Sequence, residues 1–170
     1  MNQRPSEEEY AGSSGEYIRL VPPDGNIIDI LLTQEKQMIE LLASLTESQA
    51  AYRYAEEKWT LKEVVGHIAD AERVMTYRLL RFARGDQTPL TGFDQELFMP
   101  PFGSWTTAQL AEDYRAVRQS TITLLRGLPV EAWSRKGTAN NLSITVRALA
   151  YGIAGHELHH MGGIRNRYLS

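Results

Sequence analysis

Apolar side chains recur along this chain at steps of three and four residues, a spacing that places them on one face of an α-helix. One such stripe runs from Ile27 to Leu45, a second from Leu61 to Phe82, and a third from Leu110 to Leu125. A fourth helical pattern starts at Ser143 and continues almost to the end of the chain. Four long helices with apolar stripes predict an all-α four-helix bundle.

Capping residues and helix breakers indicate where these helices start and stop. Thr60 and Thr106 are favourable N-cap residues, and Glu63 completes a capping box with Thr60. Residues 86–104 contain three prolines and two glycines, so an ordered loop is expected between the second and third helices. A turn is expected at Val130–Trp133.

The segments outside the stripes are more polar. Residues 1–16 are acidic and rich in Gly and Ser, which predicts a flexible N-terminal segment ahead of a single domain at 17–170. A polar loop is expected over Lys136–Asn141. Gly152 and Gly155 stand inside the fourth helix, where each costs about 1 kcal/mol against alanine, and they indicate close helix packing.

Composition narrows the function classes. The 170 residues carry a net charge of −3, which argues against nucleic-acid binding. No apolar run is long enough to cross a membrane, and the N-terminus lacks the pattern of a signal peptide. The chain has no cysteine, which excludes disulfides and thiolate ligands of its own. A cytoplasmic protein is expected.

The placement of the four histidines is the main chemical signal. His67 falls on the second predicted helix, whereas His156, His159 and His160 fall together on the fourth. Side chains at i and i+4 project from one face of a helix, so His156 and His160 can bind one ion together. His159 points about 100° away from His160 and is set aside. His67 is in phase with apolar neighbours and is expected to face inward.

If the second and fourth helices pack side by side, three imidazoles meet at one point. Imidazole nitrogen favours Zn²⁺, Ni²⁺, Fe²⁺ or Cu²⁺ over Mg²⁺ or Ca²⁺, which prefer oxygen ligands. Three protein ligands leave positions open for water or substrate, as in catalytic sites. The alternative interpretation is structural: a lone histidine on an apolar face commonly bonds a backbone carbonyl, and a pair at i and i+4 arises by chance.

Residues 156–160 also satisfy the H-E-x-x-H pattern of zinc proteases, in which the glutamate is the general base. Such proteases generally take their third ligand downstream, yet residues 161–170 contain no histidine, aspartate or glutamate. A protease is therefore disfavoured. Glu157 stays a weak candidate for a catalytic base; the alternatives are a supporting hydrogen bond or a surface ion pair with Arg165 or Arg147.

Further candidates flank the histidines. Asp70 is a candidate to orient a histidine ligand, and Arg73 and Arg78 are candidates to meet an anionic substrate, with ion pairs to Asp70 and Glu72 as the alternative. Aromatic residues in or beside the long loop are candidates for a pocket wall, with packing onto the core as the alternative: Phe93, Phe98, Phe102 and Trp105. Tyr151 either lines the cavity or packs.

Three stretches carry a resemblance to a known family: WTLKEVVGHIADAERVMTYRLLRFARGD, TPLTGFDQELF and VRALAYGIAGHELHHMGGIRNRYL. From about Tyr17 onward the chain resembles the DinB/YfiT-like superfamily of metal-dependent four-helix bundles. The resemblance implies that His67, His156 and His160 are the metal ligands. It also implies Zn²⁺ or Ni²⁺ as the ion, with Fe²⁺ or Mn²⁺ as alternatives, and a homodimer.

The resemblance further implies a thiol-dependent S-transferase or isomerase that uses an external low-molecular-weight thiol such as bacillithiol or mycothiol. The thiol must be external because the chain has no cysteine. Two alternatives stay open: a metal-dependent hydrolase acting through an activated water, and a non-catalytic metal-binding stress-response protein. The expected partner is a small-molecule substrate, without nucleic acid or membrane.

Overall fold

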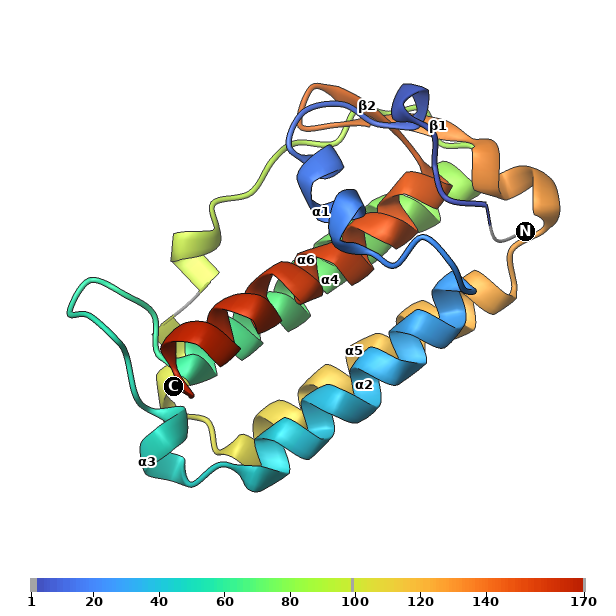
Figure 1. The fold of residues 1–170 in the computed structure, drawn as a ribbon. Helices are drawn as coiled ribbons and strands as arrows, with labels where there is room; N and C mark the ends of the chain where they lie inside the picture. Colours follow the sequence, from blue (N-terminus) through green and yellow to red (C-terminus); the bar gives the residue numbers. More distant parts are fainter. Residues whose placement is uncertain (1–2, 99, 170) are drawn as a thin grey trace.

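The computed structural model describes residues 3–98 and 100–169. Its main body is a bundle of four long helices (Figure 1), as the apolar stripes predict. These are α2 (Ile27–Ser44), α4 (Leu61–Ala83), α5 (Thr107–Arg126) and α6 (Val146–Arg167). Contacts join α2 to α5, α5 to α4, α4 to α6 and α6 to α2, which closes the ring.

The helix directions differ from those of a simple up-and-down bundle. In Figure 1, α2 and α6 run one way along the bundle, while α4 and α5 run the other way. Because α4 and α5 are consecutive and parallel, the chain between them must return along the length of the bundle. That is why the connection is long. It contains two short 3-10 helices, η2 (Gln95–Phe98) and η3 (Pro100–Ser104).

Two of the helix starts follow from capping chemistry. The Thr60 hydroxyl accepts a hydrogen bond from the backbone N–H of Glu63, and the Glu63 carboxylate accepts one from the backbone N–H of Thr60. Thr106 and Gln109 form the same box at the start of α5. These bonds satisfy N–H groups that no helical carbonyl reaches. Both predicted starts are confirmed.

A β-hairpin precedes α6, where the sequence pattern predicts a polar loop and a helix from Ser143. Its strands are β1 (Lys136–Ala139) and β2 (Leu142–Thr145). Asn140 and Asn141 form the turn with φ values of 50° and 61°, a conformation that asparagine tolerates and that two-residue hairpin turns require. α6 begins only after its N-cap, Thr145. The loop and the earlier helix start were wrong predictions.

Short elements complete the fold. α1 (Ser14–Leu20) packs against α6, η1 (Glu7–Glu9) lies near β2, α3 (Glu47–Ala50) follows α2, and η4 (Val130–Ser134) is the turn expected there. The Arg4 guanidinium donates to the carbonyls of Ile18 and Val21 at 2.7 and 2.8 Å. The segment predicted to be flexible therefore overlaps α1 and contacts the bundle. Its mobility and the domain boundary at residue 17 stay predictions. Residues 1–2 lie outside the described part.

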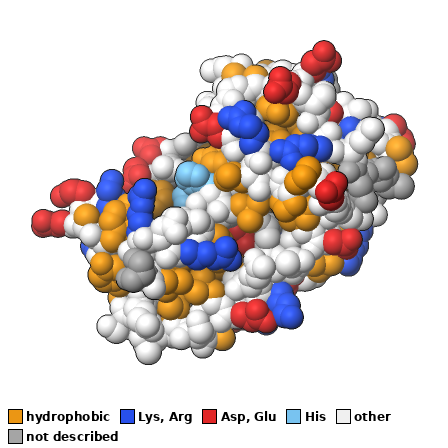
Figure 2. Space-filling model, viewed as in Figure 1, with side chains coloured by type: hydrophobic (Ala, Val, Ile, Leu, Met, Phe, Trp, Pro, Cys, Tyr) orange, Lys and Arg blue, Asp and Glu red, His pale blue; other side chains and the backbone are white. Residues whose placement is uncertain are grey.

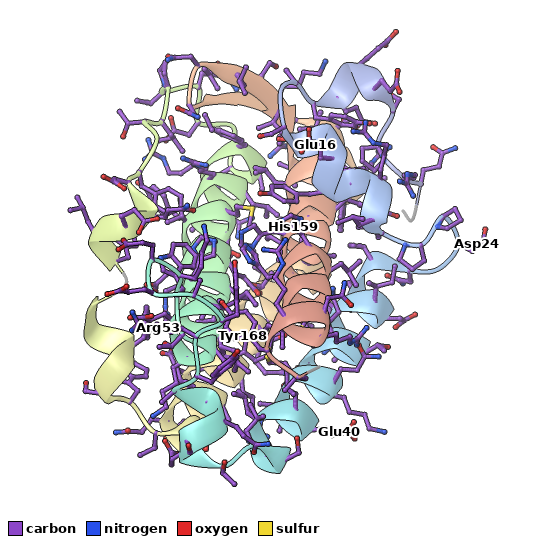
Figure 3. All side chains as sticks on the ribbon, turned by 60° about the vertical axis from the view of Figure 1, so that its left-hand side comes forward. Glu16, Asp24, Glu40, Arg53, His159 and Tyr168 are labelled. Carbon is purple, nitrogen blue, oxygen red and sulfur yellow. The ribbon has the colours of Figure 1, made fainter. Side chains whose placement is uncertain are left out.

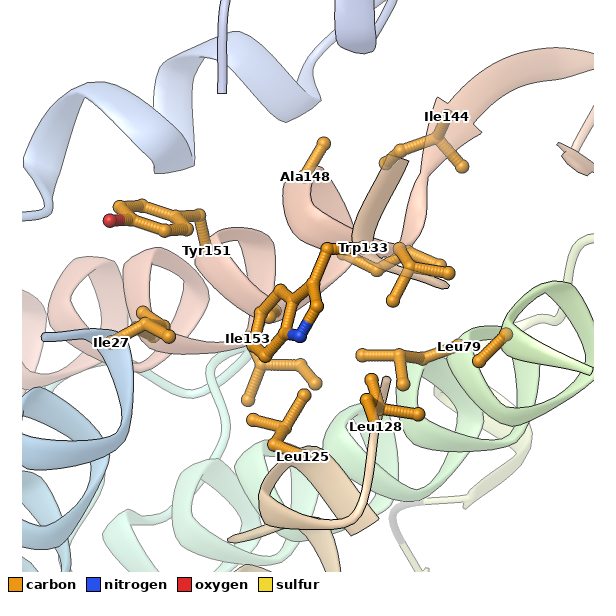
Figure 4. Packing of buried hydrophobic residues seen from close by; sticks show 14 of the residues in the cluster. Ile27, Leu79, Leu125, Leu128, Trp133, Ile144, Ala148, Tyr151 and Ile153 are labelled. Atoms are coloured by element: carbon orange, nitrogen blue, oxygen red, sulfur yellow. The ribbon is translucent and has the colours of Figure 1, made fainter. Parts of the chain in front are cut away.

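Two buried apolar clusters fill the bundle. In the first, Leu79, Leu125 and Ile153 surround Trp133 (Figure 4). The second, toward the other end, is built on side chains that include Met38, Leu61, Phe102, Tyr114 and Ile164. On α6 the buried residues of the first cluster end at Ala154 and those of the second begin at Met161, so the α6 histidines lie between them, whereas on α4 His67 is flanked by Val65 and Ile68 of the second cluster. No helix in the described ranges has the length and apolar character needed to cross a membrane.

Candidate metal centre

Three of the four histidines converge where α4 packs against α6. The Nε2 atom of His156 lies 3.1 Å from Nε2 of His67 and 3.1 Å from Nε2 of His160. The candidate ligand atoms of the three all lie within 4.8 Å of one another. The i, i+4 spacing on α6 and the antiparallel contact with α4 produce this arrangement, so the structure brings together the three residues singled out from the sequence.

Burial keeps these imidazoles neutral. The side chains of His67 and His156 are 3% and 6% exposed. Desolvation lowers the pKa of His67 to about 4. Desolvation, with repulsion from the neighbouring histidines, lowers the pKa of His160 to about 3 and that of His156 to about 2. A neutral imidazole has a free lone pair, which is the form that binds a metal ion.

Aromatic rings rather than hydrogen bonds hold two of the imidazoles. The Tyr17 ring meets His156 edge-on with centroids 5.3 Å apart, and the Trp59 ring lies 4.9 Å from that of His67. The Nδ1 atoms of both histidines are buried and have no hydrogen-bond partner among the described residues. The Nε2 atoms of His67 and His160 both face Nε2 of His156, and within the described part of the chain their hydrogen-bond contacts stay inside the cluster.

Two cavities reach the histidine cluster. One, of about 350 Å³, is lined by His67 and His156 and extends between α4 and α6 toward the hairpin. The other, of about 430 Å³, is lined by His159 and His160 and extends toward the C-terminal end of α6, beside Trp59. Histidine also reaches the molecular surface on the face drawn in Figure 2. A small molecule can therefore approach the three nitrogens.

Glu157 belongs to a different cluster. Its carboxylate is buried and accepts hydrogen bonds from the Tyr114 hydroxyl, at 2.8 Å, and from the Arg118 guanidinium. Arg118, which is 0% exposed, also binds the Glu72 carboxylate and donates to the carbonyl of Leu31. The predicted surface ion pair of Glu157 was wrong. Its carboxylate is not brought to the histidines, so the structure gives no support to a role as base.

The remaining predicted polar residues have three different outcomes. Asp70 binds Arg73, which also binds Asp113, so the alternative of an ion pair with Asp70 is confirmed for Arg73. The predicted pairing of Arg73 or Arg78 with Glu72 was wrong, because Glu72 binds Arg118. Arg78 instead lines the 350 Å³ cavity. His159 is exposed on α6 (Figure 3) and lies outside the group of three candidate ligands.

Some of the predicted aromatic residues line the cavity, whereas others pack in the apolar clusters. Phe93 lines the 350 Å³ cavity and stacks on Phe98, with centroids 5.4 Å apart. Phe102 is buried in the second apolar cluster, and Trp105 packs against that cluster. Tyr151 is buried in the first cluster, so it packs.

The two glycines of α6 have different roles. A Cβ on Gly155 would lie 2.0 Å from the carbonyl oxygen of Tyr17, so the predicted close packing is confirmed there, with α1 as the partner. A Cβ on Gly152 would meet nothing within 4 Å. Gly152 lines the 350 Å³ cavity instead, so the prediction of close packing was wrong for this residue.

Sequence reasoning missed three contributors to this region. Tyr17 and Trp59 contact the histidines from segments outside the four stripes, and only the tertiary fold places them there. For Arg118 the sequence does contain a signal, which is its spacing. Arg118 follows Tyr114 by four residues and precedes Thr121 by three, which puts a cation on the apolar face of α5.

The fold and site together define a helical-bundle protein with a buried three-histidine cluster open to two cavities. Residues 30–164 match the model of the DinB superfamily, and the chain belongs to that superfamily. It is 26% identical, over 78% of each chain, to a protein of Oceanobacillus iheyensis named "Putative metal-dependent hydrolase". The structure is similar to that of YfiT from Bacillus subtilis, with a TM-score of 0.66 and 18% sequence identity, over 98% of this chain and 93% of the YfiT chain. YfiT is described as a probable metal-dependent hydrolase with an unusual four-helix bundle topology.

Proposed function

We propose that this protein is a metal-dependent enzyme in which His67, His156 and His160 hold one divalent ion and an external low-molecular-weight thiol is the nucleophile. The observation that carries the proposal is the convergence of three Nε2 atoms, two of them from buried side chains, beside a cavity that no carboxylate of the described residues lines. Neighbouring ligands on an ion with bonds of about 2.1 Å stand roughly 3.0 to 3.4 Å apart. The separations of 3.1 Å from His156 fit such an ion.

The donor set points to Zn²⁺ or Ni²⁺, with Fe²⁺ or Mn²⁺ as alternatives, because three neutral nitrogens are poor ligands for Mg²⁺ and Ca²⁺. A bound ion of this kind lowers the pKa of a coordinated thiol or water. Tyr17 and Trp59 pack against two of the ligand imidazoles, and the sides toward both cavities stay open.

A thiol suits this site better than water. Hydrolysis through an activated water commonly uses a carboxylate or another base to move protons. No aspartate or glutamate lines the 350 Å³ cavity among the described residues, and Glu157 is bound by Arg118 and Tyr114. A thiol ionises more easily than water, so its activation depends less on a neighbouring base. The chain has no cysteine, so the thiol comes from a co-substrate.

Metal-dependent hydrolysis is the second candidate. The names of the Oceanobacillus and Bacillus proteins support it, and so do Glu57 and Glu96, which border the cavity beside His160. A thiol panel separates the two candidates: conjugation of a thiol to an electrophile supports the transferase, and thiol-independent cleavage of an ester or amide supports the hydrolase. Metal binding without either activity supports a metal-binding stress-response protein.

The metal site is tested by elemental analysis of the purified protein after reconstitution with Zn²⁺ or Ni²⁺. About one ion per chain is expected for the wild type. His67→Ala, His156→Ala and His160→Ala are expected to lose the ion, whereas the matched control His159→Ala retains it. Equal loss in all four variants contradicts the assignment. The homodimer stays a prediction, which light scattering on the reconstituted protein checks.

A further inference from the structure

The cavity of about 350 Å³ runs along one stripe of α4 and one stripe of α6. His67, Ala71, Met75 and Arg78 line it from α4, at steps of four, four and three residues. Leu149, Gly152 and His156 line it from α6. Because these steps keep side chains on one helix face, the histidines and Arg78 stand at two positions along the same wall.

The length of this wall follows from helix geometry. Eleven residues separate His67 from Arg78, which corresponds to about 16 Å along the axis of α4. The wall between them is apolar on both helices, at Ala71, Met75 and Leu149. At Gly152 the wall carries no side chain, and a Cβ there would meet nothing within 4 Å. The wall formed by α4 and α6 therefore has imidazole nitrogen at one position, a cation at another, and apolar surface between them, while Ser13, Ser14, Gln95 and Asn140 line the cavity from other segments.

Arg78 is the charged residue of this cavity, and it has no acidic partner. Its guanidinium donates to the carbonyl of Thr91 at 2.8 Å, and no carboxylate in the described ranges binds it or lines the cavity. The arginines on either side of it along α4 differ: Arg73 binds Asp70 and Asp113, and Arg81 binds Asp86. Arg78 is also half-buried, and desolvation lowers its pKa. A partly desolvated guanidinium with free N–H donors is a strong site for a carboxylate.

We propose that Arg78 determines substrate specificity by binding a carboxylate at the far end of the electrophilic substrate, whose reacting end lies at the histidines. The substrate class is a small molecule with an apolar body of roughly 10 Å and one terminal carboxylate, since the arginine side chain spans part of the distance along α4. This inference rests on the proposed function for the reacting end, but the binding of the carboxylate does not require turnover.

Binding is tested first, on the metal-free protein, by calorimetry with ω-phenylalkanoates of increasing chain length and their matched carboxamides. The wild type is expected to prefer the carboxylate by about tenfold or more, as for a hydrogen bond to a charged group. Arg78→Met should lose this preference and Arg78→Lys should keep part of it. The control Arg73→Met, on the same helix and outside the cavity, should keep it fully. A preference that survives in Arg78→Met, or that is absent in the wild type, overturns the proposal.

Turnover then separates the two possible sources of the carboxylate. With the reconstituted enzyme, kcat/KM is compared for electrophiles with and without a carboxylate at a fixed neutral thiol, and for thiols with and without one at a fixed neutral electrophile. Arg78→Met should remove discrimination among electrophiles only; loss confined to thiols overturns the assignment. If no thiol reacts at all, the proposed transferase fails while the calorimetric result still decides the role of Arg78. Should Arg78→Met not fold, Arg78→Lys and the wild-type preference carry the same test.

Discussion

Two buried polar clusters begin at adjacent residues of α6 and are built in opposite ways. Glu157 belongs to a closed network, in which its carboxylate binds Tyr114 and Arg118 and Arg118 binds Glu72 in turn. His156 belongs to an open one: its Nδ1 has no partner among the described residues, and its Nε2 faces only other histidine nitrogens. Both side chains are almost fully buried.

The two clusters therefore differ in whether their buried polar groups find partners within the protein. Buried polar groups are normally hydrogen-bonded, and each unsatisfied group costs roughly 1 to 3 kcal/mol. The network of Arg118 meets that condition within the protein. The histidine cluster does not, because the buried Nδ1 atoms of His67 and His156 have no partner among the described residues, so its geometry costs stability. The four predictions below test this contrast.

Breaking the closed network around Arg118 should cause the largest change in the free energy of unfolding. Arg118→Met leaves the carboxylates of Glu72 and Glu157 buried without their cation, which should reduce the free energy of unfolding by about 3 to 5 kcal/mol. Urea denaturation measures this loss. Arg115→Met, an exposed arginine on the same helix, is the matched control and should change stability by less than about 0.5 kcal/mol. Equal effects of the two substitutions would mean that the network is not structural.

Filling the open cluster should stabilise the protein. Zn²⁺ or Ni²⁺ at about 100 times its dissociation constant should add roughly 2.7 kcal/mol to the free energy of unfolding. Thermal melts with and without a chelator measure the gain. The response should vanish in His156→Ala and persist in Glu157→Gln. A response lost in both variants would show that the two clusters act as one.

Replacing the open cluster by apolar groups should not harm the metal-free protein. His67→Leu/His156→Leu removes the two unpartnered Nδ1 atoms and should raise the free energy of unfolding by about 1 to 2 kcal/mol at pH 7. The matched double variant Glu72→Leu/Glu157→Leu should instead destabilise the protein, because it leaves Arg118 buried without its anions. Both are compared by chelator-treated urea unfolding, and destabilisation of similar size in both would remove the distinction.

Acidification should destabilise the metal-free protein through the open cluster, by less than the changes above. Burial lowers the pKa of His67 to about 4, whereas the unfolded chain titrates near 6.5. The unfolded state therefore binds the proton first, and the stability of the metal-free protein falls as pH drops from about 6.5 toward 4. Between pH 6.5 and 5.5 the wild type should lose about 1 kcal/mol more than His67→Gln. Parallel pH profiles would contradict this pKa assignment.

The bundle was predictable because its signals are local. The apolar stripes and the boxes at Thr60 and Thr106 require only residues within the same helix. The hairpin before α6 was missed because its strands have four residues each, too few for alternation to stand out. The Asn140–Asn141 pair, which favours a tight turn, was the available signal.

The three candidate ligands were predictable for a similar reason. Helical phase selects His156 and His160 over His159, and scarcity of histidine draws attention to His67. The surroundings were not predictable in the same way. Tyr17, Trp59 and the path from the histidines to Arg78 depend on which helices become neighbours and in which direction they run, and that information is spread over the whole chain.

The long-range origin of the histidine cluster also affects when it can exist. His67 and His156 are 89 residues apart in sequence, so closing the loop between them costs entropy that only the docking of α4 and α6 repays. During synthesis, α4 leaves the ribosome well before α6, so His67 is present before His156 and His160. A chain that ends before α6 contains His67 alone, so the cluster cannot yet form. The complete three-histidine cluster therefore forms late and reports a correctly assembled bundle.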